Sequence, residues 1–238
     1  MLLESIDLFR YILIYIFMLG IGGILFIIVA ALVLRRSLKQ LNQIFSLFFI
    51  SIAISSIINA IYASLRAPSL VLVLHLLTYY LFSFAMCFLF LFNLILLKSV
   101  KKIDRKIQLL FIAVWGLILL GIFPLGILDG VKIDETTGWK PMWEFSFFLY
   151  GFTVCFLYMI IPTLYWSIKI YKQFQDKEMK KRWRIFISGI CFYYIVWGGN
   201  SIVNVLSIDF VRSFWSIILF FSFFTLYIIY YGVAKQLD

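Results

Sequence analysis

The chain has 238 residues, of which 64% are hydrophobic and only 13% are charged, whereas soluble domains carry about 25% charged residues. This composition excludes an ordinary soluble domain, because a soluble core could not bury so much apolar surface. Lipid must therefore be the solvent for most of the chain. A formal net charge of +10 would favour nucleic acid as the partner of a soluble protein, but the positions of the basic residues explain this charge differently.

Seven apolar runs follow one another along the chain, and each is long enough to cross a bilayer as a helix, which takes about 20 residues. They cover approximately residues 10–34, 44–65, 70–97, 107–128, 142–170, 184–206 and 211–234. The first run exceeds the apolar core of a signal peptide, about 7–15 residues, so we expect it to be retained. Short polar breaks separate the runs. The sequence therefore predicts one domain over residues 1–238, an all-α bundle of seven transmembrane helices.

The basic residues gather in alternate loops. Sixteen of the 21 lie after the first, third, fifth and seventh runs: Arg35, Arg36, Lys39, Lys98, Lys101, Lys102, Arg105, Lys106, Lys169, Lys172, Lys177, Lys180, Lys181, Arg182, Arg184 and Lys235. The other side holds Arg10, Arg66, Lys132, Lys140 and Arg212. Because short loops rich in Lys and Arg stay in the cytoplasm, we expect a multi-pass protein of the cell membrane with its N-terminus outside and its C-terminus inside. The surplus charge then meets anionic lipid head groups of the bilayer, and no nucleic-acid partner is expected.

Polar side chains in the second and third runs lie in the half nearer the outside. Asn59 and Arg66 belong to the outer part of the second run, and His75 and Tyr79 to that of the third. A polar group in hydrocarbon needs a partner, so these residues either join helices or line a pocket. His75 is the only histidine and has no companion ligands at metal-site spacing, so no metal is expected. The three cysteines lie inside apolar runs without a CxxC motif, which indicates small buried side chains rather than redox chemistry.

Between the fourth and fifth runs lies the polar stretch ETTGWKPMWEF, residues 135–145. Pro141 suits the first position of a helix, where a missing N–H is tolerated. Trp139 and Trp143 suit a membrane interface, where amphipathic rings are enriched. The stretch is thus either an interfacial anchor with a helix start or a lid over a pocket, in which Glu144 would face the outer polar residues.

The sixth and seventh runs narrow the function classes. Asn200 and Asn204 are one turn apart in WGGNSIVNVL and share a face, which serves either helix packing or a pocket wall. The seventh run has no lysine, so a retinal Schiff base is excluded. No carboxylate lies in the middle of a run, which argues against an ion pump. The cytoplasmic half is mostly apolar, which fits a through-channel poorly.

The end of the chain carries a resemblance. The stretch ISGICFYYIVWGGNSIVNVL, the turn SIDF and the helix FFSFFTLYIIYYGVAKQLD, with its aromatic pair, small residue and basic tail, resemble the end of the seven-helix N-terminal membrane region of prokaryotic sensor histidine kinases. The resemblance implies a ligand-sensing module that signals through its last helix. Up to Asp238 there is no phosphorylatable His motif and no ATP-binding motif, so kinase activity is not carried over. The signal is expected to reach a cytoplasmic partner or an output domain missing from this chain.

The leading hypothesis is a membrane receptor or sensor without catalytic activity or cofactor, which binds an unknown small-molecule or lipid ligand in its outer half. The candidate ligand-binding residues are Asn59, Arg66, His75, Tyr79, Trp143, Glu144, Asn200 and Asn204. Arg66 would pair with Glu144 or with an anionic ligand. The alternatives are a transporter or channel subunit for a small or lipid-like solute, and a lipid-modifying enzyme, which one histidine and scattered acids make improbable.

Overall fold

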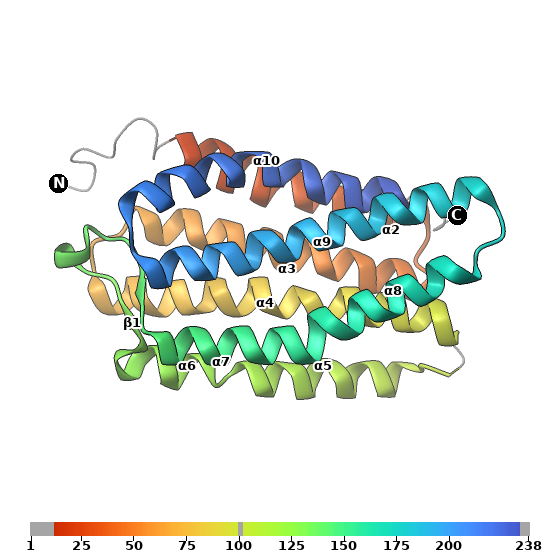
Figure 1. The fold of residues 1–238 in the computed structure, drawn as a ribbon, viewed down its shortest axis with the longest axis horizontal. Coiled ribbons are helices and arrows are strands. Elements are labelled where there is room, and N and C mark those ends of the chain that lie inside the picture. The colour runs from red at the N-terminus through yellow and green to blue at the C-terminus, as the bar shows by residue number, and fades with distance from the viewer. Residues whose placement is uncertain (1–11, 100–101, 234–238) are drawn as a thin grey trace.

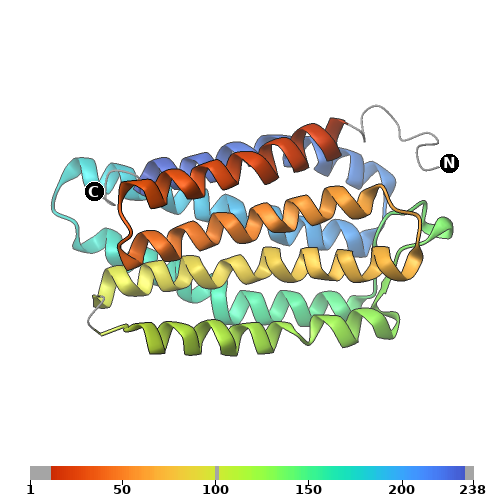
Figure 2. The same cartoon turned by 180° about the vertical axis from the view of Figure 1, so that it is seen from behind.

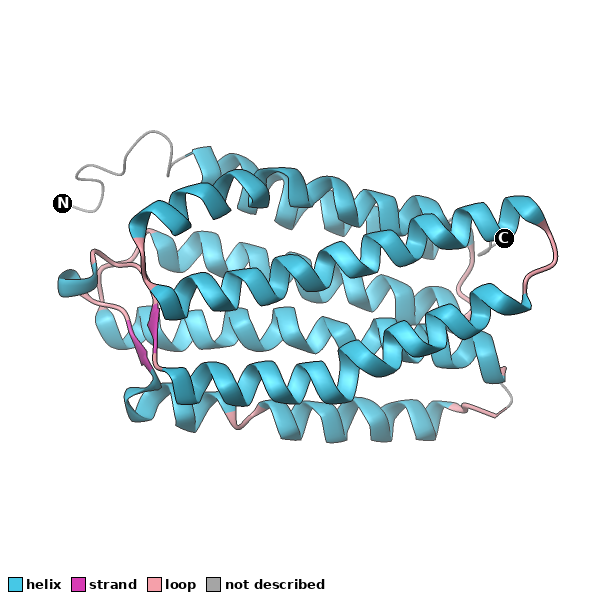
Figure 3. Ribbon diagram, viewed as in Figure 1, coloured by secondary structure: helices cyan, strands magenta, loops and turns pink. Residues whose placement is uncertain are grey.

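The computed structural model describes residues 12–99 and 102–233, and almost all of this part is helical, which confirms the all-α prediction (Figure 3). The first and last expected runs extend slightly beyond these residues. The helical elements are η1 (Ile12–Leu25), α2 (Phe26–Arg36), α3 (Gln40–Ala63), α4 (Pro68–Lys98), α5 (Arg105–Leu119), α6 (Ile122–Leu125), η2 (Gly126–Gly130), η3 (Glu135–Thr137), α7 (Phe145–Cys155), η4 (Phe156–Ile160), α8 (Ile161–Gln173), α9 (Lys177–Leu206) and α10 (Asp209–Val233). The strands are β1 (Val131–Lys132) and β2 (Met142–Trp143).

Several of these helices are suited to a bilayer. In the described part of the chain, five helical stretches are long and apolar enough to cross a membrane: Gln40–Ala63, Pro68–Lys98, Arg105–Gly130, Phe145–Gln173 and Lys177–Leu206. Their outward faces carry large apolar side chains such as Leu109 and Leu117, which are 65% and 67% exposed. Water would disfavour such faces and lipid does not, so these are the helices of a multi-pass membrane protein.

The helices lie side by side as long rods in two layers (Figures 1 and 2). One layer contains α2, α3, α4 and α5 in chain order, and the other contains α7 with α8, then α9 and α10. The strands β1 and β2 lie at one end of the bundle, which we call the hairpin end. The opposite end, where α2 finishes at Arg35 and Arg36 and α4 finishes at Lys98, is called the basic end.

Local sequence signals set several helix boundaries. The side chain of Asp104 accepts a hydrogen bond from the Ile107 N–H at 2.9 Å and caps α5. Asp176 accepts from the Met179 N–H at 2.7 Å and caps α9. Helix α9 therefore begins at Lys177, earlier than the apolar run predicted from residue 184, because the capped polar turns continue the same helix beyond the apolar segment.

Prolines explain the two bends of the long rods. The wide turn η4 ends two residues before Pro162, which has no N–H to donate and crowds the carbonyl four residues before it, within η4. The rod from α7 to α8 is visibly offset at this point (Figure 1). Pro124 has the same effect on the rod of α5 and α6. The residue four positions before it, Leu120, lies in the interruption between these two helices.

The predicted start of the fifth span is wrong in one respect. Pro141 does not open a helix, because the chain remains extended and β2 pairs antiparallel with β1, with Val131 opposite Trp143. Helix α7 starts only at Phe145, after Glu144. The Glu144 N–H donates to the Gly130 carbonyl at 2.9 Å, which closes this hairpin.

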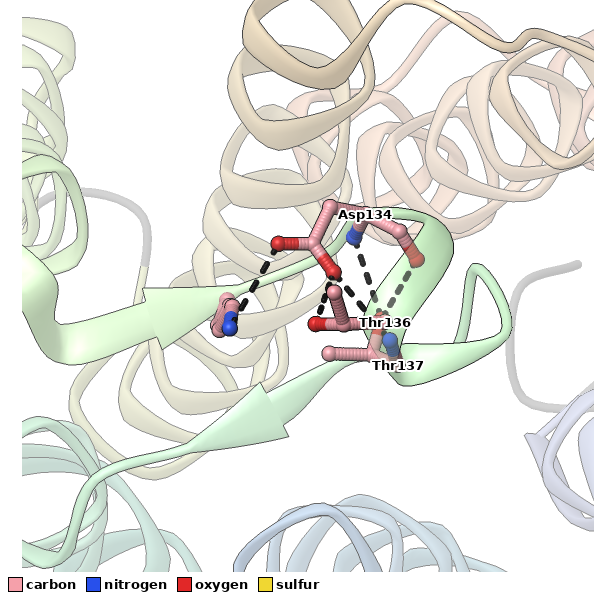
Figure 4. Close-up of polar contacts among 4 residues, drawn as sticks. Asp134, Thr136 and Thr137 are labelled. Atoms are coloured by element: carbon pink, nitrogen blue, oxygen red, sulfur yellow. Dashed lines mark hydrogen bonds and ion pairs between the residues drawn. The ribbon is translucent and has the colours of Figure 1, made fainter.

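The tip of the hairpin is held by its own side chains (Figure 4). Asp134 accepts from the Thr136 hydroxyl at 2.6 Å and from the Thr137 N–H at 3.1 Å, and the Asp134 N–H donates to the Thr137 hydroxyl at 3.0 Å. Lys132 lies 3.6 Å from the second carboxylate oxygen of Asp134. Gly138 has φ of 60°, in the left-handed region that glycine adopts without a steric penalty. The tip is therefore an ordered loop, which we call the hairpin loop (residues 131–144).

Candidate functional site

A chain of hydrogen bonds joins two helices and the hairpin loop around the only histidine. The Asn59 amide donates to the Tyr62 hydroxyl at 3.0 Å, and this hydroxyl lies 3.0 Å from His75 Nδ1. On the other side of the ring, Trp143 Nε1 donates to His75 Nε2 at 3.0 Å. Asn59 and Tyr62 come from α3, His75 from α4 and Trp143 from β2. We call these four residues the His75 network.

The network defines the protonation of its imidazole. The indole N–H of Trp143 can only donate, so His75 Nε2 must accept, and the ring proton is on Nδ1, which donates to the Tyr62 oxygen. The ring is therefore neutral. An imidazolium would direct a second N–H at the Trp143 N–H and lose this bond, so the neutral form keeps the hairpin loop attached to α4.

An aromatic cluster continues from the network into the bundle. The ring centroid of Tyr79 lies 4.7 Å from that of Trp143 and 6.1 Å from that of Trp197, with which it is stacked at an interplanar angle of 9°. Trp143 also meets Phe147 edge-on at 4.9 Å. Trp197 Nε1 donates to the Ser83 hydroxyl at 2.9 Å. These contacts join α4, β2, α7 and α9 into one packed unit beneath the hairpin loop.

Close approach at Tyr79 requires a glycine on α7. A Cβ added to Gly151 would lie 2.5 Å from the Tyr79 hydroxyl. This hydroxyl is buried without a hydrogen-bond partner, and Ser83 and Ser201 are polar neighbours of it. The absence of a side chain on Gly151 thus provides the space that the phenol ring occupies.

The hairpin loop is also attached to the start of α10. Arg212 Nη2 donates to the Pro141 carbonyl at 2.6 Å and to the Ser207 hydroxyl at 3.3 Å. Lys140 forms an ion pair with Asp209, with 2.6 Å between Nζ and Oδ1. The loop therefore connects α4, through Trp143 and His75, with α10, through Pro141 and Arg212.

Of the predicted site residues, the structure brings Asn59, His75, Tyr79 and Trp143 together. Trp143 is only 5% exposed, so its ring packs inside the protein, where its N–H has a buried acceptor in His75. The exposed Glu144 lies outside the cluster and precedes the first residue of α7.

The predicted pairing of Arg66 with Glu144 is not formed. The Arg66 guanidinium lies 5.2 Å from the ring centroid of Trp139 and donates to the backbone carbonyls of Ala63 and Leu65. A cation above an indole face is electrostatically favourable, and this contact attaches the hairpin loop to the end of α3. Arg66 is exposed and stays at the rim of the site.

Asn200 and Asn204 lie on α9, beside the cluster rather than within its hydrogen bonds. Asn204 is 7% exposed and Asn200 is half-buried. In the described part of the chain, neither amide side chain forms a hydrogen bond, and Asn204 takes part only through its backbone carbonyl, which accepts from the Ser207 hydroxyl at 2.8 Å. Gly199, which precedes Asn200, lies against the Trp215 ring, and a Cβ added to this glycine would overlap that ring.

Four residues that contribute to the site were not predicted from the sequence: Tyr62, Ser83, Trp197 and Arg212. A general rule could have indicated Trp197, because a buried indole N–H needs an acceptor, and here it donates to the Ser83 hydroxyl. Tyr62 lies three residues after Asn59, on the same face of α3. Arg212 was read only as a charge of an outer loop, and the carbonyl it binds is 71 residues away in sequence.

Within residues 12–99 and 102–233, no three His, Cys, Asp or Glu side chains come together as metal ligands. The arrangement offers hydrogen bonds, aromatic faces and cations. Comparison of the chain with protein-family models, curated proteins and solved structures finds no match in any of the three. The site is therefore interpreted from its own geometry.

Proposed function

We propose that the chain is a membrane receptor or sensor of seven transmembrane helices, without catalytic activity, whose hairpin end lies outside the cell and whose basic end lies in the cytoplasm. A small-molecule or lipid ligand binds at the hairpin end, and the signal leaves at the cytoplasmic end of α10. The alternation of basic loops supports this orientation. In the proposal, the seven crossings are the five long apolar stretches together with the first rod of the chain (η1 and α2) and the last (α10).

One observation carries this proposal, the double attachment of the hairpin loop. Trp143 attaches the loop to α4 through His75, and Pro141 attaches it to α10 through Arg212. A ligand that binds one arrangement of the loop better than another shifts the population of both attachments. Because α10 is one long helix, a shift at its first turn is transmitted to its far end.

The resemblance to sensor histidine kinases supports the direction of the signal. In that family the last membrane helix leads to the output domains, and here α10 holds the corresponding place. The receiver is then a cytoplasmic partner or an output domain outside this chain. The basic end, with its Lys and Arg side chains, is the surface that would meet it.

Cysteine accessibility tests the orientation. In a background with alanine at the three native cysteines, Thr136→Cys should react with a membrane-impermeant maleimide in intact cells, because Thr136 is exposed on the hairpin loop. Lys177→Cys, exposed at the start of α9, should react only after the cells are permeabilised. Labelling of Lys177→Cys but not Thr136→Cys in intact cells would reverse the proposed orientation.

The coupling is tested at the far end of α10. Spin labels at Leu38 and Tyr231, which are 73% and 51% exposed, report the distance between the α2–α3 connection and the end of α10 by pulsed electron paramagnetic resonance. Arg212→Gln removes the attachment to Pro141 and should change this distance distribution. Arg66→Gln is the matched control. It also removes a cation that contacts the hairpin loop, through Trp139, but this cation is attached to the end of α3 rather than to α10. Identical distributions for Arg212→Gln and the parent chain would contradict the proposal.

Transport is the alternative that liposomes decide. The purified chain should neither conduct potassium nor scramble a fluorescent phosphatidylcholine between leaflets. Activity in either assay above that of protein-free liposomes would favour a transporter or channel instead of a receptor.

A further inference from the structure

Two hydrogen-bond donors on α10 are buried without an acceptor. They are Nε of Arg212 and Nε1 of Trp215. A buried N–H that is not bonded costs free energy, and a native structure usually satisfies it with protein, water or ligand. Since Arg212 and Trp215 are three residues apart on one helix, their side chains leave the same face, with about 5–6 Å between their Cβ atoms. The two unbonded donors therefore belong to neighbouring side chains of α10.

The two side chains lie between α9, α10 and the hairpin loop. Arg212 Nη2 is occupied by the Pro141 carbonyl and the Ser207 hydroxyl, which orients the guanidinium. The six-membered ring of Trp215 lies directly against Gly199, which orients the indole. The donors are thus held by contacts that do not use them.

The charge at this corner is positive. Asp209 is the nearest acid, and its carboxylate is bound by Lys140 at 2.6 Å. No carboxylate among the described residues forms an ion pair with Arg212. The opposite face of α10 presents Phe210 and Phe214, which are 79% and 58% exposed and suit lipid. An acceptor that reaches Arg212 and Trp215 therefore meets a cation without an ion pair, whose nearby acid Asp209 is already bound by Lys140, and two N–H groups without a hydrogen bond.

We propose that Arg212 and Trp215 form a binding site for an anionic oxygen group, a carboxylate or a phosphate, which accepts from Nε of the one and Nε1 of the other. Guanidinium and carboxylate or phosphate are matched in charge and in planar geometry. The inference rests on the proposed function and names the chemistry of its ligand. Binding at Arg212 would act directly on the residue that attaches the hairpin loop to α10.

A neutral ligand is disfavoured by the same observations. The site offers donors and a cation, and among the described residues the amides of Asn200 and Asn204 on α9 make no hydrogen bond that would orient their carbonyls. The anion has two sources, a free carboxylate in the medium or the head group of an anionic lipid. Each source has its own arm in the experiment below.

The first arm uses hexanoate with the full chain in phosphatidylcholine nanodiscs, and affinity is measured by ligand-detected NMR titration. Hexanamide has the same shape without the charge and should bind at least about tenfold more weakly, because a charged hydrogen bond is lost. Trp215→Phe removes one N–H and keeps a ring, and should weaken hexanoate about tenfold. Trp115→Phe is the matched control, because Nε1 of Trp115 is also buried and unbonded but lies on α5.

The second arm replaces part of the phosphatidylcholine with phosphatidylglycerol. If a lipid head group is the anion, phosphatidylglycerol raises the unfolding temperature of the parent chain, and this increase is lost in Trp215→Phe and in Arg212→Lys, which keeps the charge without the fork of N–H groups. Dependence on Trp215 in the first arm, or on Trp215 and Arg212 in the second, supports the site.

Two results would overturn the inference. One is equal binding of hexanoate and hexanamide together with no effect of phosphatidylglycerol. The other is a response to either anion that Trp215→Phe and Trp115→Phe change to the same extent. Failure of the receptor proposal is distinguishable, because the spin-label experiment on Arg212→Gln uses no ligand and reads only the attachment between the hairpin loop and α10.

Discussion

Two buried hydrogen-bond networks, one at each end of the bundle, connect different elements. At the basic end, the Ser167 hydroxyl donates to Asn93 Oδ1 at 3.1 Å, the Asn93 amide donates to the Leu89 carbonyl at 3.0 Å, and Trp183 Nε1 donates to the Ser167 carbonyl at 2.8 Å. We call Asn93, Ser167 and Trp183 the Asn93 network. All three residues are fully buried, and they join α4, α8 and α9.

The His75 network, at the hairpin end, joins α3 and α4 to a loop instead of to a third helix. Its central ring can hold one proton or two, and only the neutral form accepts from Trp143. The Asn93 network contains no titratable group, and two of its three donors end on helix carbonyls. The basic end is thus fastened helix to helix, whereas the hairpin end is fastened through a loop and a titratable ring.

The largest expected effect comes from breaking the Asn93 network. Trp183→Ala should lower the free energy of unfolding by about 3–5 kcal/mol, because it removes a fully buried indole and leaves a cavity. Unfolding of the purified chain by denaturing detergent, followed by circular dichroism, measures this loss. Trp166→Ala, at a half-buried position on α8 next to Ser167, is the control and should cost less. Equal losses would mean that the basic end is not fastened through Trp183.

The next effect concerns the close contact between α4 and α7. Gly151→Ala should destabilise by about 1–3 kcal/mol, because its Cβ would lie 2.5 Å from the Tyr79 hydroxyl. Tyr79→Phe alone should be close to neutral, since its hydroxyl has no hydrogen bond, and should restore part of the loss in the double variant. A double-mutant cycle of detergent unfolding measures the coupling, and simple additivity of the two substitutions would refute the contact.

A smaller and more local effect is expected in the His75 network. Trp143→Phe keeps an aromatic ring and removes the N–H that His75 accepts, at a cost of about 1 kcal/mol in unfolding. Hydrogen–deuterium exchange of the hairpin loop should accelerate, while that of α8 and α9 stays unchanged. Trp183→Phe is the matched variant of the other network and should leave loop exchange unaffected. Faster loop exchange in Trp183→Phe would remove the distinction between the two ends.

The smallest effect is a pH dependence at the tip of the hairpin loop. Hydrogen bonding from Thr136, with Thr137 and Lys132 adding to it, holds the pKa of the Asp134 carboxyl below its ordinary value. Because this pKa is lowered by folding, the contribution of the carboxylate is present above the unfolded pKa of about 3.9 and is lost as the pH falls through the lower folded value. The loop should therefore be unchanged from pH 8 to pH 5.

An NMR titration of the Thr137 amide checks this expectation, since its N–H binds Asp134 at 3.1 Å. The midpoint of its chemical-shift change should lie below about 3.9, and Asp134→Asn should abolish the step. A midpoint at or above that of an unfolded aspartate would contradict the hydrogen bonding drawn in Figure 4.

Features that depend on a few neighbouring residues were predictable. Helical segments followed from runs of apolar residues, the left-handed conformation at Gly138 followed from its residue type, and the caps at Asp104 and Asp176 carry ordinary helix-start residues. The start of α7 was not predictable in this way, because Pro141 satisfies both a helix start and an extended strand. The choice depended on β1, which lies on the other side of the loop.

The candidate site was predictable as a set of residue types and not as a set of contacts. Asn59, His75 and Tyr79 were selected because polar groups in lipid need partners, and Trp143 because it lies in the polar stretch 135–145. The structure brings these four together. The pairing of Arg66 with Glu144 failed, because an adjacent aromatic face and backbone carbonyls satisfied the guanidinium first.

The sequence by itself determined that this chain is an all-α protein suited to a membrane, because hydropathy and helix length are summed over consecutive residues. The tertiary structure alone decided which polar groups meet. Trp143 reaches His75 across 68 positions and Arg212 reaches Pro141 across 71, and no local pattern specifies partners at such separations. They are set by how the rods pack, which brings the hairpin loop over α4 and against α10 at the same time.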